Sequence, residues 1–421
     1  MIRNAVIWPM TGTEPFVGDL LMGDGKILQI GKNLPCADAE VIEAQGLYCT
    51  PGFIDAHCHI GMWEDGIGTP GDDGNEDTSP STPQLRAVEG VNPRDRCFDE
   101  ALQAGITTVA TGPGSANVIG GQFCALKTCG SSVEDRLVRA PVAMKVALGE
   151  NPKMVYGGKD KTPKTRMASA AILRENLKKA QIYAEKENPD YDAAMEALVP
   201  VVRGELPLKI HAHRADDIQT AIRVMKEFGL PYTLEHCTEG YLIPESLKEA
   251  NVLPIIGPLI CERAKVELAN LTMRAPALLW QHGIPFAIMT DHPVIPIQYL
   301  PVCAALAVRE GCPEEIALQA ITIQAACALG LQDTLGSLEP GKEADVVLFD
   351  GHPLAFRTKP VKVFVAGEER LSSQTTPAGQ RGFVAQASPV GEDKPLAQTV
   401  APGGAGPSAH PLTPDEESPC P

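Results

Sequence analysis

Residues 51–61 read PGFIDAHCHIG, an apolar run that ends in two histidines separated by one residue. Side chains at positions i and i+2 of a strand point to the same face, so His57 and His59 can reach one point together. Two histidines with this spacing can bind one divalent cation. The stretch therefore predicts a buried strand at residues 53–57 whose carboxyl end carries metal ligands.

Apolar runs of the same kind recur along the chain and alternate with segments of helical periodicity. Further strands are predicted at residues 107–111, 123–127, 142–148, 208–211, 232–236, 252–256 and 286–290, and helices at 165–187, 216–228, 297–309 and 313–329. Strands that alternate with helices are typical of βαβ units and a parallel sheet. The predicted fold class is α/β, and its architecture is a (β/α)8 TIM barrel.

The two ends of the chain carry a different pattern, of short runs broken by Gly and Asp turns. We expect residues 1–52 and 336–372 to form one small β-sandwich domain, and residues 53–335 to form the barrel. Residues 373–421 are rich in Pro, Gly, Ser and Gln without apolar periodicity, which predicts a disordered tail. A further Gly-, Pro- and Asp-rich segment at residues 61–90 predicts a long functional loop directly after the first barrel strand.

The bulk composition excludes several classes of protein. A formal net charge of −17 argues against a surface for nucleic acid or anionic lipid. Twelve cysteines without a CxxC pair indicate neither a disulfide scaffold nor a zinc ribbon. Because a signal-peptide pattern and an apolar run of membrane-spanning length are both absent from the sequence, we expect a cytoplasmic protein.

Other candidate ligands fall at the ends of later predicted strands, where barrel enzymes place their active sites. KIHAHR supplies His211 and His213, TLEHCT supplies His236, and MTDHPV supplies Asp291. The alternative interpretation is a set of hydrogen-bonded core histidines. So many imidazoles at one end of a barrel would be costly to bury without a cation, which favours a metal site.

The motif order HxH, His, His, Asp resembles that of the amidohydrolase superfamily, in its imidazolonepropionase-like and prolidase-like branch. The closing phrase GSLEPGKEADVVLFD, which begins the second piece of the β domain, strengthens the resemblance, which covers residues 1 to about 372. It implies a hydrolase that acts on the carbon–nitrogen bond of an amide, a lactam or a dipeptide. It also implies a divalent metal, with Zn²⁺ as the default and one or two ions bound.

The resemblance further implies the role of each ligand. His57 and His59 would bind the more buried ion, His211 and His236 the second, and Asp291 would bind metal and act as general base. A carboxylated lysine or a glutamate often bridges two ions in this family, and AMKVALGENPK offers both Lys145 and Glu150. The odd separation of these two residues would put them on opposite faces of a regular strand, so only one can be the bridge.

Several polar residues near these motifs are candidates to bind a small-molecule substrate. They are His213, Asn117, Gln122, Tyr156 and Arg214. A deaminase is the rival reaction, although deaminases of this superfamily usually carry a glutamate shortly after the fifth-strand histidine, where this chain has Ala212, His213 and Arg214. A catalytically inactive structural homologue is a further alternative, and homo-oligomerisation is left open.

Overall fold

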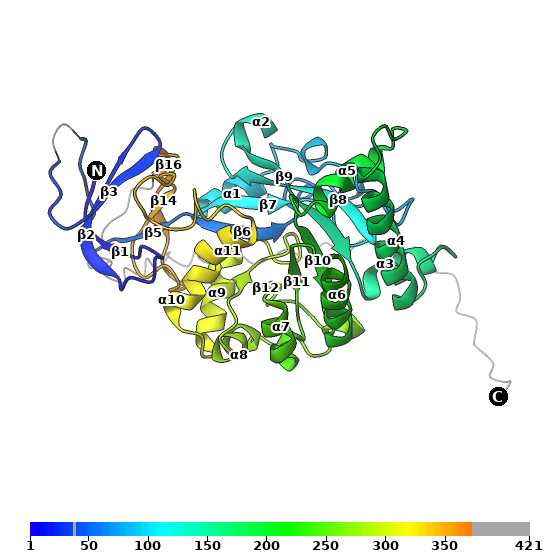
Figure 1. Cartoon of the computed structure of the whole chain (residues 1–421). Helices are drawn as coiled ribbons and strands as arrows, with labels where there is room; N and C mark the ends of the chain where they lie inside the picture. Colours follow the sequence, from blue (N-terminus) through cyan, green and yellow to red (C-terminus); the bar gives the residue numbers. More distant parts are fainter. Residues whose placement is uncertain (37–38, 373–421) are drawn as a thin grey trace, which may run out of the picture. The chain divides into compact units, whose positions relative to one another are not determined.

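The computed structural model describes residues 1–36 and 39–372, so the predicted tail lies outside the described residues. The described chain contains two sheets of eight strands each. The first sheet draws on both ends of the chain and the second on its middle (Figure 1).

The first sheet has the order β16-β15-β14-β5-β1-β2-β3, with β4 paired to β1. Strands from the two chain ends therefore share one sheet, where β14 pairs with β5, and the blue and orange strands lie together in Figure 1. Its strands are β1 (Ile2–Ile7), β2 (Phe16–Gly23), β3 (Lys26–Gly31), β4 (Ile42–Glu43), β5 (Tyr48–Pro51), β14 (Val346–Phe349), β15 (Pro360–Val365) and β16 (Glu368–Ser372). The expected sandwich and the domain boundaries at residues 52 and 336 stay predictions.

The second sheet has the order β13-β12-β11-β10-β9-β8-β7-β6. Each of its strands overlaps one of the predicted apolar runs. They are β6 (Phe53–Cys58), β7 (Ile106–Thr111), β8 (Ile119–Lys127), β9 (Leu137–Ala147), β10 (Leu208–Ala212), β11 (Tyr232–His236), β12 (Leu253–Ile256) and β13 (Ala287–Ile288). Every residue of β6, β7 and β10 is buried, which explains why these strands read as continuous rather than alternating apolar runs.

The second sheet is mixed, so the expectation of eight parallel strands is wrong. Strand β8 runs antiparallel to both β7 and β9, while the remaining neighbours are parallel. The physical reason is the length of the connections. Residues 112–118 and 128–136 are too few for the crossover of a dozen or more residues that a parallel pair requires.

The two edges of this sheet approach each other, which gives a nearly closed, barrel-like sheet in a mixed α/β fold. The His59 N–H donates to the carbonyl of His292 at 2.8 Å, and the Asp291 N–H donates to that of His57 at 3.3 Å. These bonds join the carboxyl-terminal end of β6, with the residue after it, to the segment that follows β13. The carboxyl ends of the first and last strands therefore meet at one rim.

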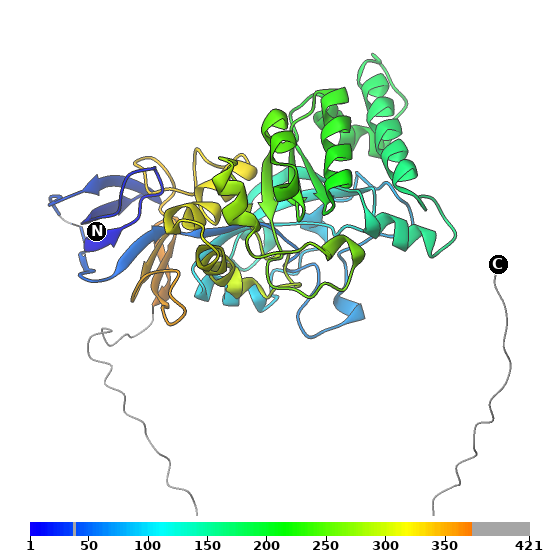
Figure 2. The ribbon, with the colours of Figure 1, turned by 90° about the horizontal axis from the view of Figure 1, so that it is seen from below.

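Helices pack outside the second sheet, as the green and yellow segments show in both views (Figures 1 and 2). The helix predicted at residues 313–329 is wrong as a single element, because the chain turns at Ile321, whose carbonyl accepts the N–H of Ile54 on β6. Within the described residues, none of the helices combines the length and apolarity that a membrane crossing needs. The helices are α1 (Cys97–Gln103), α2 (Val133–Arg136), α3 (Glu150–Gly157), α4 (Arg166–Ala184), α5 (Ala193–Val202), α6 (Ala215–Phe228), α7 (Pro244–Ala250), α8 (Ala275–Gln281), α9 (Leu300–Arg309), α10 (Glu314–Ala320) and α11 (Ile323–Ala328).

Candidate metal centre

Six candidate ligands gather at the carboxyl ends of β6, β10 and β11 and just after β13. They form two groups, and the ligand atoms within each group lie within 4.8 Å of one another. The first group is His57, His59 and Asp291, and the second is His211, His213 and His236. The structure thus brings together residues that are far apart in the sequence, and it adds His213 to the imidazoles of the second group.

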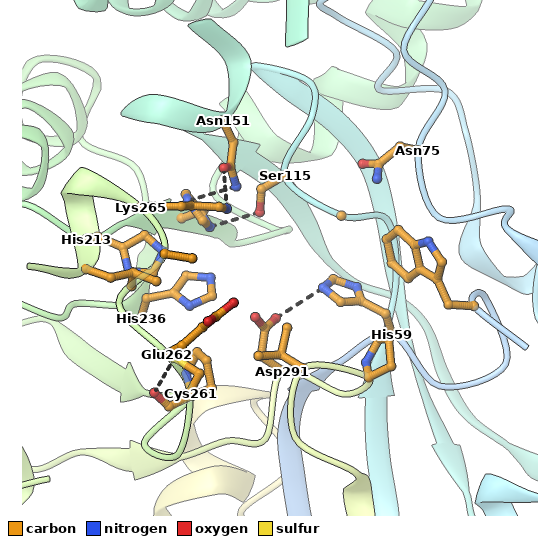
Figure 3. A pocket seen from close by; sticks show the side chains of 18 residues that line it. His59, Asn75, Ser115, Asn151, His213, His236, Cys261, Glu262, Lys265 and Asp291 are labelled. Carbon is orange, nitrogen blue, oxygen red and sulfur yellow. Dashed lines mark hydrogen bonds and ion pairs between the residues drawn. The ribbon is translucent and has the colours of Figure 1, made fainter. Parts of the chain in front are cut away.

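The first group has a carboxylate that faces two imidazoles. Asp291 Oδ1 lies 3.2 Å from His59 Nε2 and 3.7 Å from His57 Nε2 (Figure 3 shows the contact with His59). On its far side the His59 ring donates through Nδ1 to the carbonyl of Gly112 at 2.7 Å. Because Nδ1 is occupied by this bond, Nε2 is the ring atom of His59 that is directed at the carboxylate and is available as a metal ligand.

His57 is oriented by charged groups that are fully buried. Its Nδ1 lies 2.7 Å from Glu235 Oε2, and that oxygen is also 3.0 Å from Lys209 Nζ. Lys209 additionally donates to the carbonyl of Ala56 at 3.1 Å, and Lys145 Nζ donates to His57 Nε2 at 3.2 Å. A carboxylate at Nδ1 favours the tautomer that has its proton on Nδ1 and its lone pair on Nε2, the atom that can bind metal.

The second group consists of three stacked or edge-on rings. The ring centroid of His236 lies 4.3 Å from those of both His211 and His213. The Nδ1 atom of each ring has a partner on the outer side: Ser115 for His211, Thr238 for His213, and the carbonyl of Gly257 for His236. The buried Nε2 atom of His236 has no hydrogen-bond partner among the described residues.

Backbone conformation lets adjacent residues of β11 reach the site together. Simple alternation would send Glu235 and His236 to opposite faces of the strand. His236 instead has a φ of 68°, in the left-handed region, and Asp291 likewise has a φ of 55°. Such conformations cost free energy in residues other than glycine and occur most often at functional sites.

Burial sets the protonation state of the imidazoles. It lowers the pKa of His57, His211, His213 and His236 well below the ordinary value, and the positive charge of Lys145 lowers each of them further. The four rings are therefore neutral at physiological pH, which is the form that binds metal. Neutral imidazole lone pairs that converge beside a carboxylate are a donor set that fits Zn²⁺ or a related divalent cation.

The structure separates the two candidates for a bridging residue. Lys145 is fully buried beside His57, and burial lowers its pKa to about 8 although Glu235 and Asp291 act to raise it. Glu150 instead begins α3, where its carboxylate accepts the N–H of Glu267 at 3.2 Å. The position of Lys145 between buried ligands favours it over Glu150, and its bridging role stays a prediction.

The remaining candidates for substrate contact occupy varied positions. Asn117 and Tyr156 donate to backbone carbonyls of the loop at residues 61–90, at Ser79 among others, and Gln122 donates to the carbonyl of Pro83. The partly exposed Arg214 forms an ion pair with Asp216. These contacts show that Asn117, Tyr156 and Gln122 hold the long loop, and direct contact with substrate stays a prediction for all four residues.

A cavity of about 370 Å³ opens onto both groups of ligands. Trp63 lines this cavity, and the centroid of its ring lies 4.9 Å from that of His59. Lys265 donates to Asn151 at 2.7 Å (Figure 3). Sequence reasoning did not single out Trp63, Lys265 or the buried Lys209 and Glu235. Lys209 and Glu235 could have been found from the sequence, because each is a charged residue within an apolar run, PLKIHA and YTLEH respectively.

Comparisons with known proteins identify the family of the chain. Residues 48–370 match the model of the amidohydrolase family. The solved structure of an amidohydrolase from Thermotoga maritima has a TM-score of 0.86 and 42% identity, and the match covers 88% of this chain and 99% of that one.

Two curated relatives are more distant. The amidohydrolase tasK of Hapsidospora irregularis is 27% identical over 87% of this chain, but the chain spans only 42% of that protein's length. The imidazolonepropionase of Caldanaerobacter subterraneus subsp. tengcongensis is 23% identical over 83% of this chain and 91% of its own length. The resemblance drawn from the sequence is confirmed, and the chain belongs to the amidohydrolase family.

Proposed function

We propose that this protein hydrolyses a carbon–nitrogen bond in a small amide, lactam or cyclic amide, with a divalent cation as cofactor. The observation that carries the proposal is the position of Asp291. Its carboxylate faces the Nε2 atoms of His57 and His59 at 3.7 and 3.2 Å, and it lines the cavity. Its side chain is 13% exposed, so it is accessible from the cavity but largely shielded from bulk water.

His57 and His59, with Asp291, would hold the cation, and a second ion would lie at His211 and His236. Zn²⁺ is the default for this donor set. When bound, such a cation acidifies water and polarises a carbonyl oxygen. Lys145 would be the bridge as a carbamate, formed when its neutral amine adds carbon dioxide and releases one proton. Its buried amine has a lowered pKa and is neutral more readily than an ordinary lysine.

Asp291 would act as the general base and then as the general acid. Its carboxylate takes a proton from the attacking water while the water oxygen bonds to the carbonyl carbon. The same proton then passes to the leaving nitrogen as the carbon–nitrogen bond breaks, so water is added across that bond. One carboxylate beside the reacting atoms can serve both steps.

The cavity supports a small-molecule substrate. Its volume of about 370 Å³ is at the lower end of the range for ligand sites. Trp63, Leu268 and Pro293 provide apolar surface, while Asn75, Asn151 and Lys265 provide polar groups. This mixture favours a compact ligand with an apolar part and several hydrogen-bonding groups, such as a cyclic amide or an acyl amino acid.

The test is a screen of metal-replete protein against hydantoins, imidazolones, lactams and acyl dipeptides, scored for acid release. Deamination is the rival outcome, scored as ammonia from aminated heterocycles. Metal analysis of protein purified without chelators comes first. An inactive structural homologue would carry no stoichiometric metal, and protein without metal would contradict the proposal.

Asp291→Asn is expected to abolish turnover of any substrate found, because the amide cannot accept the proton. Circular dichroism should show an unchanged fold, and Asp99→Asn on the exposed face of α1 is the matched control for the charge. Retained turnover in Asp291→Asn would remove this residue as the base.

A further inference from the structure

Glu267 is a fully buried carboxylate beside the second group of histidines. It lies in a short 3-10 helix, η4 (Val266–Leu268), in the segment between β12 and α8. Its Oε2 accepts the N–H of Glu150 at 3.0 Å. Its Oε1 has no hydrogen-bond partner among the described residues. A buried carboxylate oxygen without a partner is costly unless a positive charge compensates it.

The unpaired oxygen faces two candidate ligands. Glu267 Oε1 lies 3.7 Å from His213 Nε2 and 3.8 Å from His211 Nε2. These separations are too long for hydrogen bonds. They match the spacing of atoms that share one cation, because ligand bonds of about 2.0–2.2 Å place neighbouring ligand atoms roughly 3–4 Å apart.

We propose that Glu267 supplies a carboxylate ligand, beside His211 and His213, to the cation site of the second group of histidines. The three imidazoles carry no negative charge, so the carboxylate would contribute the only charge compensation from this set. A cation there would also satisfy Glu267 Oε1, which is buried without a hydrogen-bond partner among the described residues. The inference rests on the proposed function, which places a second ion at His211 and His236, and it adds His213 and the carboxylate of Glu267 to that site.

A purely structural role for Glu267 explains only part of its surroundings. Glu267 and Glu150 form a reciprocal tie, in which each carboxylate accepts the backbone N–H of the other residue at 3.0 and 3.2 Å. This tie fastens the segment after β12 to the start of α3. It uses Oε2 and the backbone of Glu267, and it leaves Oε1 directed at the histidines.

The experiment compares the wild type with Glu267→Gln and Glu150→Gln. Each variant keeps an oxygen that can accept the backbone bond of the tie, but only Glu267→Gln removes the charge that faces the histidines. Metal-free protein is titrated with Zn²⁺ in competition with a chromophoric chelator, which yields the number of equivalents and the affinity of each. Thermal unfolding of the metal-free variants reports their stability separately.

We expect two equivalents in the wild type and in Glu150→Gln. In Glu267→Gln one equivalent should bind at least tenfold more weakly while the other keeps the wild-type affinity. The inference would be overturned if Glu267→Gln bound both equivalents with wild-type affinity, or if the wild type bound only one. An equal loss of Zn²⁺ affinity in Glu150→Gln would overturn it as well. If the wild type binds one equivalent of Zn²⁺ and is an active amidase, only the site at Glu267 is overturned. If it binds no Zn²⁺ and has no activity, the proposed function is overturned too.

Discussion

The position of His57 depends on charges that never reach the solvent. Glu235 and Lys209 are 0% and 1% exposed, and Glu235 Oε2 lies 2.7 Å from His57 Nδ1 and 3.0 Å from Lys209 Nζ. A buried ion pair is weak evidence for stability, because desolvation offsets most of the attraction. The buried pair of Glu235 and Lys209 is better explained as a device that orients the His57 ring for metal binding.

Glu235→Gln is expected to weaken the binding of the cation held by His57 by roughly tenfold to a hundredfold, the effect of removing an outer-shell carboxylate. The variant also leaves Lys209 buried without a counter-charge, which costs about 3–5 kcal/mol. Chelator competition measures the affinity, and urea unfolding measures the stability.

The double variant Glu235→Gln, Lys209→Met separates the two effects. It should recover much of the stability of the metal-free protein while metal affinity stays low. Recovery of metal affinity together with stability would show that Glu235 matters only for the fold.

The buried histidines predict acid sensitivity of the metal-free protein. Their pKa values are lowered by burial, while in the unfolded chain they return to about 6.5. Below that pH the unfolded state binds more protons, so the stabilisation is complete above about pH 6.5 and is lost as the pH falls toward the lowered values.

Chelator-treated protein should therefore unfold at a lower urea concentration at pH 5.5 than at pH 7.5. Replacing the exposed His282 by Gln is the control and should leave the pH dependence unchanged. Equal unfolding midpoints of the metal-free protein at the two pH values would contradict neutral, buried imidazoles.

At the scale of elements, the long loop after β6 forms a wall of the site. Trp63 lies edge-on to His59, and a side chain at Gly74 would meet the Trp63 ring at 2.1 Å. The Gly74 carbonyl also accepts the N–H of Gly114, which follows β7. Gly74 thus lets the loop fold closely over the indole and keep it against the metal ligand.

Gly74→Ala is expected to displace the Trp63 ring, at a cost of about 1–3 kcal/mol of overpacking strain. KM for a substrate found in the screen should rise severalfold, while metal content stays at the wild-type level. Gly90→Ala in the same loop is the control, because a side chain there makes only an ordinary contact of 3.4 Å. An unchanged KM in Gly74→Ala would remove Trp63 as a wall of the substrate site.

At the scale of the whole molecule, a buried ion pair links the two sheets. Lys127 at the end of β8 lies 2.8 Å from both Glu343 and Asp345, which precede β14. Burial lowers the pKa of Lys127, but the two carboxylates outweigh it and raise the pKa above its usual value. The stabilisation is therefore complete at neutral pH and is lost only as the pH rises above about 10.5.

Lys127→Met should reduce the free energy of unfolding at pH 7.5 by about 3 kcal/mol, because Asp345 loses its buried partner. Lys179→Met, in an exposed pair with Glu175 on α4, is the matched control and should change it by less than about 0.5 kcal/mol. Urea unfolding measures both variants, and equal effects would show that the link between the sheets does not stabilise the fold.

The sequence by itself determined the positions of the strands and the candidate ligands at their ends. Apolar runs report burial directly, and a histidine or aspartate at the end of such a run stands out without any knowledge of contacts between strands. The spacing in PGFIDAHCHIG was enough to place His57 and His59 at one rim. These features are local, so a local pattern encodes them.

Tertiary structure alone decided the direction of β8, the preference for Lys145 over Glu150, and the approach of Glu267 to the histidines. Glu267 and Trp63 lie outside the strands, where no periodicity predicts which way the chain turns. The left-handed backbone at His236 also reverses the face that alternation would assign to it. Such features arise from packing between distant segments, and a pattern within one segment does not contain that information.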